Sequence, residues 1–143
     1  MSGNLSYAER QKGINVGEEL FEAYCKMKNV HFIHIGFAEK KQDIPKYWEL
    51  NAYLRNLPDY LVMTEEKHFL VMVKGSNNMK QKEIEMIPQF LEWYGSKDVE
   101  LYYAFCFQDK NTPTFRTPDQ VVELYQKAQD KQWTDGKIYR TIF

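Results

Sequence analysis

Apolar and polar positions in the first half of the chain predict a helix, then a strand, then a hairpin. Residues 14–28 place apolar side chains at helical spacing, with glutamates in the first turn and lysines in the last, as the helix dipole favours. Residues 30–37 are rich in β-branched and aromatic types, which is typical of a strand. Residues 59–64 and 68–74 are further strand candidates, and the short polar link between them predicts an antiparallel hairpin.

The second half of the chain alternates helical and strand patterns. Residues 80–94 repeat apolar side chains at helical spacing, but Pro88 predicts a kink or a new helix start there. Residues 99–107 predict another buried strand. Thr117 is followed by proline at the first helical position and by Gln120 three residues after the cap, a sequence that favours a helix start.

Two segments have a less distinct pattern. Residues 38–56 are polar, charged and aromatic, and we expect an excursion with a short helix around residues 47–54. Residues 136–143 could add an edge strand. The order of the elements predicts an α/β protein in which helices flank a central mixed sheet. The length of 143 residues predicts a single domain over residues 1–143.

Composition narrows the class of protein. Hydrophobic residues make up 43% of the chain and charged residues 27%, as in ordinary globular proteins. No apolar run approaches the roughly 18 residues that span a bilayer, and the N-terminal residues lack the apolar core of a signal peptide. We therefore expect a cytoplasmic protein with reduced cysteines. The net charge of −1 argues against bulk electrostatic binding of nucleic acid but is compatible with a local basic groove.

The hairpin carries the residues with chemical content. Asp59 opens its first strand and Lys74 closes its second, so the turn brings both side chains to the same end of the sheet. A lysine at the end of so apolar a strand requires an acidic partner nearby, because an unpaired buried ammonium is costly. Asp59 is the natural partner, and Glu18 is another if the first helix packs across the sheet.

In order and spacing, these motifs resemble the PD-(D/E)xK nuclease superfamily, which includes restriction endonucleases, Holliday-junction resolvases and phage exonucleases. The matching motifs are an acidic residue in the first helix (Glu18 or Glu22), then Pro58-Asp59, then VMVKG at residues 71–75. The element order also resembles the restriction-endonuclease-like core. Gln89, followed by Trp93 and Tyr94, is similar to the Q-x-x-x-Y element of the RecB-like branch. The resemblance covers about residues 13–107.

The resemblance implies a metal-dependent deoxyribonuclease that hydrolyses DNA phosphodiester bonds with Mg²⁺ or Mn²⁺. A small single domain favours a structure-selective or end-processing enzyme of the resolvase or phage-nuclease type, acting in the host cytoplasm if a phage encodes it. A resolvase activity would imply a homodimer, because two symmetric cuts need two sites.

The resemblance also implies roles for particular residues. Asp59 would be the central metal ligand and the Val73 carbonyl another. Lys74 would position or deprotonate the attacking water, and Glu18 would contribute a carboxylate from its helix. Glu22 shares the helix face of Glu18 and is the alternative ligand.

Basic residues flank the motif on both sides and form a candidate DNA-binding surface. A solvated surface without a ligand is the competing interpretation. The candidate DNA contacts are Lys40, Lys41, Lys80, Lys82 and Gln89.

One position departs from the family pattern, because Met72 replaces the acid two residues before the lysine. Strand alternation places Met72 on the face of Lys74, and a thioether is a poor ligand for Mg²⁺. Three explanations are open. The acid has moved to the next helix, where Glu85 is preferred over Glu83; or Glu18 and Asp59 hold a metal alone; or the fold is a catalytically silent module that binds DNA or a protein partner.

Overall fold

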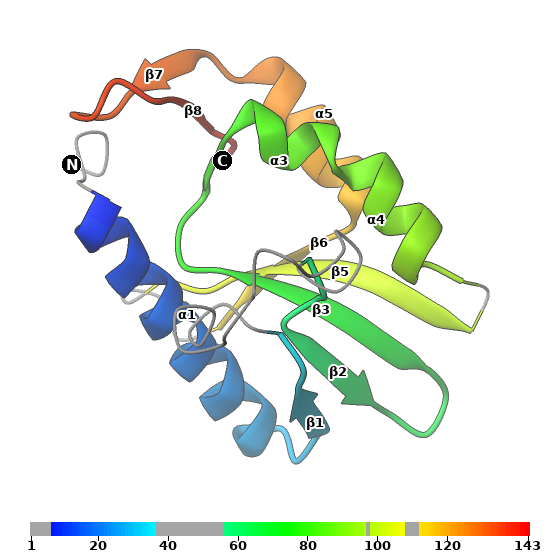
Figure 1. The fold of residues 1–143 in the computed structure, drawn as a ribbon. Coiled ribbons are helices and arrows are strands. Elements are labelled where there is room, and N and C mark those ends of the chain that lie inside the picture. The colour runs from blue at the N-terminus through cyan, green and yellow to red at the C-terminus, as the bar shows by residue number, and fades with distance from the viewer. Residues whose placement is uncertain (1–6, 37–55, 97, 108–111) are drawn as a thin grey trace, which may run out of the picture.

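The computed structural model describes residues 7–36, 56–96, 98–107 and 112–143, with side chains from residue 16 onwards. The expected excursion at 38–56, with its short helix, Lys40 and Lys41, lies almost wholly outside these ranges. The elements, labelled as in Figure 1, are α1 (Tyr7–Met27), β1 (His31–His34), β2 (Tyr60–Met63), β3 (His68–Lys74), β4 (Asn78–Met79), α3 (Gln81–Glu85), α4 (Ile87–Tyr94), β5 (Val99–Phe105), β6 (Thr114–Arg116), α5 (Pro118–Lys127), β7 (Asp130–Gln132) and β8 (Ile138–Thr141).

A five-stranded mixed sheet, in the order β1-β2-β3-β5-β6, forms the centre of the described structure. Its neighbouring strands are antiparallel except for β3 and β5, which run parallel. The helices α3 and α4 form the crossover between these two strands, as a parallel connection requires. A second, antiparallel sheet has the order β4-β8-β7.

Helices cover the two faces of the large sheet unequally. Figure 1 shows α1 on one face and α3, α4 and α5 on the other. On the α1 face, Phe21 packs in one apolar cluster with Tyr60 and Val71. On the opposite face, Met72 packs against an apolar cluster that includes Ile87 and Val121. The central strand β3 is therefore covered on both sides, which explains its nearly continuous apolar sequence.

Most of the predicted elements are confirmed. The β2–β3 hairpin forms, and β3 has the predicted bounds. The helix at 80–94 is divided, with Pro88 in the first turn of α4. Thr117 caps α5 as predicted, because its side chain accepts from the Gln120 amide while the Gln120 side chain accepts from the Thr117 amide. The mixed α/β class is therefore confirmed.

Three details differ from the sequence-based expectation. The first helix begins at Tyr7 rather than near residue 14. The C-terminal strand β8 is the middle strand of the second sheet rather than an edge strand, because β4 and β7 pair with it on its two sides. The short strands β4, β6 and β7 were not predicted at all.

None of the helices in the described ranges combines the length and apolar character needed to cross a bilayer.

Candidate active site at the ends of β2 and β3

Asp59 lies immediately before β2 and is held against β3 by two hydrogen bonds. Its backbone amide donates to the Val71 carbonyl at 3.0 Å, and its Oδ2 accepts from the Val73 amide at 2.7 Å. On the other side, the amides of Ile35 and Gly36 donate to the Asp59 carbonyl at 2.9 and 3.3 Å. The carboxylate is therefore fixed at one end of the sheet, between the chain that follows β1 and the end of β3.

Gly36 leaves the space that this carboxylate occupies. A Cβ on Gly36 would lie 3.1 Å from both Asp59 Oδ1 and Asp59 Cα, closer than side chains normally pack. A glycine at this position thus allows the chain after β1 to approach Asp59 directly.

Lys74 ends β3 and forms an ion pair with Glu83 of α3. The sequence-based expectation of Asp59 or Glu18 as its acidic partner was therefore wrong, because α3 brings Glu83 to the end of β3. Met72 packs among side chains of the α3–α5 face, so Met72 and Lys74 share that face as strand alternation predicts. Asp59 contacts the residues on either side of Met72, and Lys74 directly follows Val73. The structure therefore brings Asp59 and Lys74 to one end of the sheet.

Both carboxylate oxygens of Glu83 are engaged. Oε1 accepts from the Lys74 ammonium, and Oε2 accepts from the Lys80 amide at 2.7 Å at the start of α3. Burial alone would raise the pKa of Glu83, but Lys74 and the Lys80 amide outweigh it and hold this pKa below its ordinary value. Glu83 is therefore an anion that fixes Lys74 and caps α3 at the same time.

Helix α1 approaches the same end of the sheet very closely. A Cβ on Gly17 would lie 2.9 Å from Gly75 Cα, directly after Lys74. The next helical residue, Glu18, is only 3% exposed, and its Oε2 lies 3.2 Å from His34 Nε2. With Glu18 ionised, Nε2 is the donor, because a carboxylate only accepts. Glu18 is thus a buried acid oriented by the last residue of β1.

Glu22, one turn later, has a different partner. It accepts a hydrogen bond from the hydroxyl of Tyr60, a fully buried residue of β2. Burial, followed by this bond and the neighbouring carboxylates of Glu18, Glu22 and Asp59, raises the pKa of Tyr60 far above its usual range. The hydroxyl therefore stays protonated, and Glu22 anchors α1 to the sheet.

Oxygen atoms of the kind that hard divalent cations bind lie at this end of the sheet. The Val73 amide and carbonyl point to the same side of their strand, so the carbonyl is directed toward Asp59. Among the described residues, no three histidine, cysteine or acidic side chains are arranged so that they could hold a metal ion by themselves. Mg²⁺ commonly uses one or two carboxylates, with water and substrate phosphate as further ligands.

The other candidate residues lie on α3, at its start and on α4. Glu85, the preferred replacement acid, is exposed, and Glu83 is the residue of α3 that contacts Lys74. Lys80 is half-buried and Lys82 exposed at the start of α3, so both belong to the surface beside Glu83. Gln89 donates to Glu92 at 3.2 Å within α4.

Sequence reasoning underestimated two residues. Glu83 was ranked below Glu85 as the replacement acid. Its orientation depends on where α3 begins, and the pattern at 80–94 does not specify that point. His34 was not among the candidate site residues, since nothing in the sequence indicates that it pairs with Tyr60 and lies beside Glu18. The sequence carries no ordinary capping signature for Glu83, because the N-cap residue Lys80 is not a serine, threonine, aspartate or asparagine.

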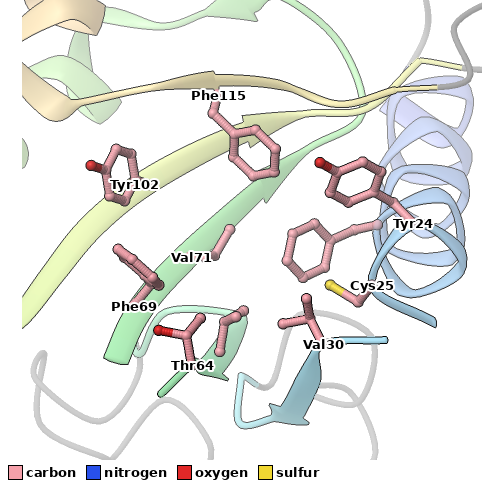
Figure 2. A pocket seen from close by; sticks show the side chains of 10 residues that line it. Tyr24, Cys25, Val30, Thr64, Phe69, Val71, Tyr102 and Phe115 are labelled. Atoms are coloured by element: carbon pink, nitrogen blue, oxygen red, sulfur yellow. The ribbon is translucent and has the colours of Figure 1, made fainter. Parts of the chain in front are cut away.

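A cavity of about 270 Å³ lies on the α1 face, away from these polar groups. Figure 2 shows the aromatic rings around it, with Tyr24 and Phe115 on one side and Phe69 and Tyr102 on the other. Its lining is almost wholly apolar, so it offers few groups for catalysis.

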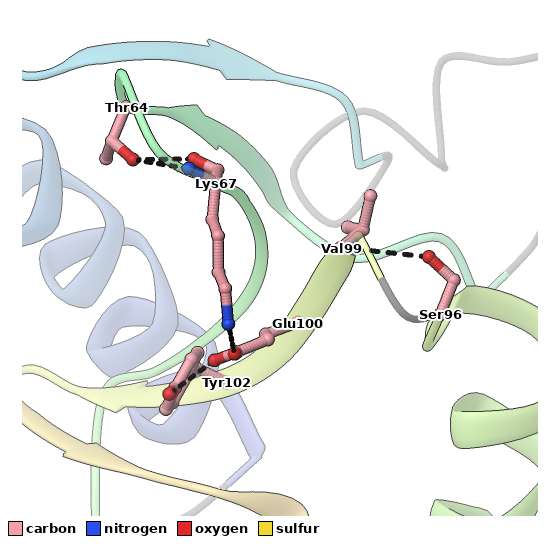
Figure 3. Close-up of polar contacts among 6 residues, drawn as sticks. All are labelled: Thr64, Lys67, Ser96, Val99, Glu100 and Tyr102. Carbon is pink, nitrogen blue, oxygen red and sulfur yellow. Dashed lines mark hydrogen bonds and ion pairs between the residues drawn. The ribbon is translucent and has the colours of Figure 1, made fainter.

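The opposite end of the β3–β5 pair has its own polar contacts, shown in Figure 3. Lys67, in the β2–β3 turn, donates to Glu100 at 2.6 Å, and the Tyr102 hydroxyl donates to the same carboxylate at 2.7 Å. The Lys67 ammonium and the Tyr102 hydroxyl hold the pKa of Glu100 below its ordinary value. This network fastens the hairpin turn to β5 far from Lys74.

Comparison of the chain with protein-family models and with curated proteins yields no match.

Proposed function

We propose that this chain is a metal-dependent deoxyribonuclease with a restriction-endonuclease-like core of the PD-(D/E)xK type. The observation that carries the proposal is the convergence of Asp59 and Lys74 at the ends of β2 and β3. The strand order supports it, because a helix, an antiparallel three-stranded unit and a helical crossover to a parallel strand match the element order of that core.

Asp59 and the Val73 carbonyl are the proposed metal ligands. The Val73 amide holds Asp59 Oδ2, and Oδ1 lies beside Gly36. A Mg²⁺ or Mn²⁺ ion bound there would lower the pKa of a bound water and offset the negative charge that develops on the phosphate. The amide hydrogen bond fixes the carboxylate before any ligand arrives, so little reorganisation is needed.

Lys74 supplies a positive charge next to the proposed ligands. Glu83 keeps the ammonium at the end of β3, where it can hydrogen-bond a phosphate oxygen or the attacking water. Each oxygen of Glu83 accepts one hydrogen bond, from the Lys74 ammonium and from the Lys80 amide. We therefore assign Glu83 to holding Lys74 rather than to replacing the acid lost at Met72. Of the three explanations for Met72, the geometry favours Asp59 and Glu18 as the remaining acids.

One observation favours a second candidate function, a silent nuclease-fold protein that binds DNA or a protein partner. Met72 fills the position of the usual acid, and the charge of Lys74 is already balanced by Glu83. A site with one fewer carboxylate binds a cation more weakly, which would suit a fold retained for binding alone.

Incubation of the chain with supercoiled, linear and branched DNA in Mg²⁺ or Mn²⁺ tests the proposal. We expect cleavage that is lost in Asp59→Ala and in Lys74→Ala. Lys67→Ala is the matched control, since Lys67 lies at the other end of the hairpin. Far-UV circular dichroism checks that each variant folds. Cleavage by folded Asp59→Ala at the wild-type rate would remove this site from the chemistry.

Met72→Glu separates the two candidate functions. In a working nuclease with a weakened cation site, the added carboxylate should lower the Mn²⁺ concentration that half-saturates cleavage. If the protein is catalytically silent, the wild type shows no cleavage at any Mn²⁺ concentration. Any cleavage by Met72→Glu is then an activity that the substitution has introduced. The measurement is a Mn²⁺ titration of cleavage by parent and variant.

A further inference from the structure

We propose that His34 is a positioning residue of this site, which holds the Glu18 carboxylate in place for the cation. This inference rests on the proposed function. It also assigns different roles to the two α1 acids, which sequence reasoning treated as alternatives.

The position of His34 is fixed by the sheet rather than by the helix that carries Glu18. His34 pairs with Tyr60 across β1 and β2, and the two rings meet edge to face with their centres 4.9 Å apart. A strand residue packed in this way has little rotational freedom. Its Nε2 is thus a preset donor, 3.2 Å from Glu18 Oε2.

Glu18 depends on such a donor. Its side chain is 4% exposed, and a buried carboxylate is costly unless hydrogen bonds compensate for the lost water. A glutamate also has three rotatable bonds, so its carboxylate needs an anchor to stay in one orientation. His34, whose side chain is 29% exposed, supplies this anchor at the rim of the site.

The residues that directly follow His34 contact Asp59. Two residues after His34, the amide of Gly36 donates to the Asp59 carbonyl, as does that of Ile35. His34 and Asp59 are therefore parts of one hydrogen-bonded sheet end. By holding Glu18, His34 ties the helical acid to the same run of chain whose amides contact Asp59.

Glu22 cannot take the place of Glu18 in this arrangement. Its carboxylate accepts from Tyr60, which is fully buried beneath α1. Release of Glu22 would leave a buried hydroxyl without this partner, which is unfavourable. The geometry therefore assigns the anchoring role to Glu22 and the role in the site to Glu18.

Two substitutions separate the hydrogen bond of His34 from its packing. His34→Phe keeps a ring against Tyr60 but cannot donate, whereas His34→Gln keeps a donor and loses the ring. The readout is the Mn²⁺ concentration that gives half of the metal-induced rise in Tm, measured without DNA. We expect His34→Phe to raise this Mn²⁺ concentration about tenfold, as loss of a ligand-orienting hydrogen bond commonly does. His34→Gln, which keeps a donor, should recover most of the affinity for Mn²⁺.

His31→Phe is the matched control, because His31 lies on the same strand with an exposed side chain. It should titrate like the wild type. If His34→Phe titrates like the wild type, or if His34→Gln is as weak as His34→Phe, the positioning role is overturned. Should His34→Phe fail to fold, Glu18→Gln replaces it. The neutral isostere should weaken Mn²⁺ binding, and an unchanged midpoint would overturn the inference.

Asp59→Ala distinguishes failure of this inference from failure of the proposed function. If Asp59→Ala abolishes the Mn²⁺ response while His34→Phe leaves it intact, only the role of His34 is overturned. If wild type and Asp59→Ala respond to Mn²⁺ identically, the proposed site itself fails.

Discussion

At the scale of single residues, Glu83 serves two neighbours at once, the Lys74 ammonium and the Lys80 amide. Glu83→Gln removes the charge that compensates a half-buried ammonium. We expect the free energy of unfolding at pH 7 to fall by about 1–2 kcal/mol, since a charge-assisted hydrogen bond is lost. Urea denaturation measures this loss. Glu85→Gln, an exposed acid on the same helix, should unfold like the wild type.

The pH dependence of stability provides a separate prediction for Glu83. Its pKa is lowered in the folded protein, so its contribution is present above the unfolded pKa of about 4.3 and is lost as pH falls through the folded pKa. The stability difference between wild type and Glu83→Gln should therefore shrink as pH falls below about 4. A difference that stays constant down to pH 3 would contradict this assignment.

Sequence reasoning predicted that Asp59 and Lys74 lie at one end of the sheet because each stands at the end of a strand within one hairpin, which is a local pattern. It preferred Glu85 to Glu83, whereas Glu83 is the residue that contacts Lys74. Two residues on a short helix differ only in direction, and the sequence pattern does not specify that direction. His34 and Glu18 meet through contacts between α1 and β1, which only the packed structure specifies.

At the scale of elements, the contact between α1 and the end of β3 depends on Gly17. A Cβ at this position would lie 2.9 Å from Gly75 Cα, so Gly17→Ala must push the helix away from the strand. We expect a loss of about 1–3 kcal/mol in unfolding free energy, as overpacking commonly causes, together with weaker Mn²⁺ binding. Glu19→Ala, on the exposed side of α1, is the control. Wild-type stability in Gly17→Ala would show that this close approach is dispensable.

Helix α5 offers a test that does not depend on function. Thr117→Ala removes the side-chain oxygen that accepts from the Gln120 amide at 3.2 Å. Loss of such a cap costs about 1 kcal/mol, which thermal or urea unfolding can measure. Gln126→Ala, an exposed position in the same helix, should be neutral. If Thr117→Ala lowers the free energy of unfolding by less than about 0.3 kcal/mol, the capping interpretation is contradicted.

Long elements with a regular pattern were predictable, whereas short ones were not. The pattern at 68–74 specifies β3 by itself, and Pro88 marks the division of the following helix. Strands β4, β6 and β7 contain only two or three residues each, too few to show an alternation. Each is defined by its partner strand, so the information lies elsewhere in the chain.

At the scale of the whole molecule, β8 fastens the segment that leads from Lys74 to Glu83. Thr141 donates to the buried Asn78 side chain at 2.7 Å, next to the β4–β8 pairing. Thr141→Val keeps the shape but leaves the Asn78 oxygen without this donor, and we expect a cost of about 1–2 kcal/mol in urea unfolding. Thr134→Val, exposed in the β7–β8 connection, is the matched control. Equal stability of the two variants would contradict this role of β8.

The mixed sheet was predictable from the order of the elements, because a helix between two buried strands favours a parallel crossover. The place of β8 was not predictable, since it depends on a pairing between residues more than sixty positions apart.

The parallel pairing of β3 with β5 has a consequence for synthesis on the ribosome. The β2–β3 hairpin emerges first, and its apolar strand has no partner on one side until residue 105 has been made. In that interval the nascent chain presents an unpaired, hydrophobic edge, the kind of surface through which chains aggregate. Substitutions that slow the formation of α3 and α4 should therefore lower the soluble yield of the protein, even where the finished fold tolerates them.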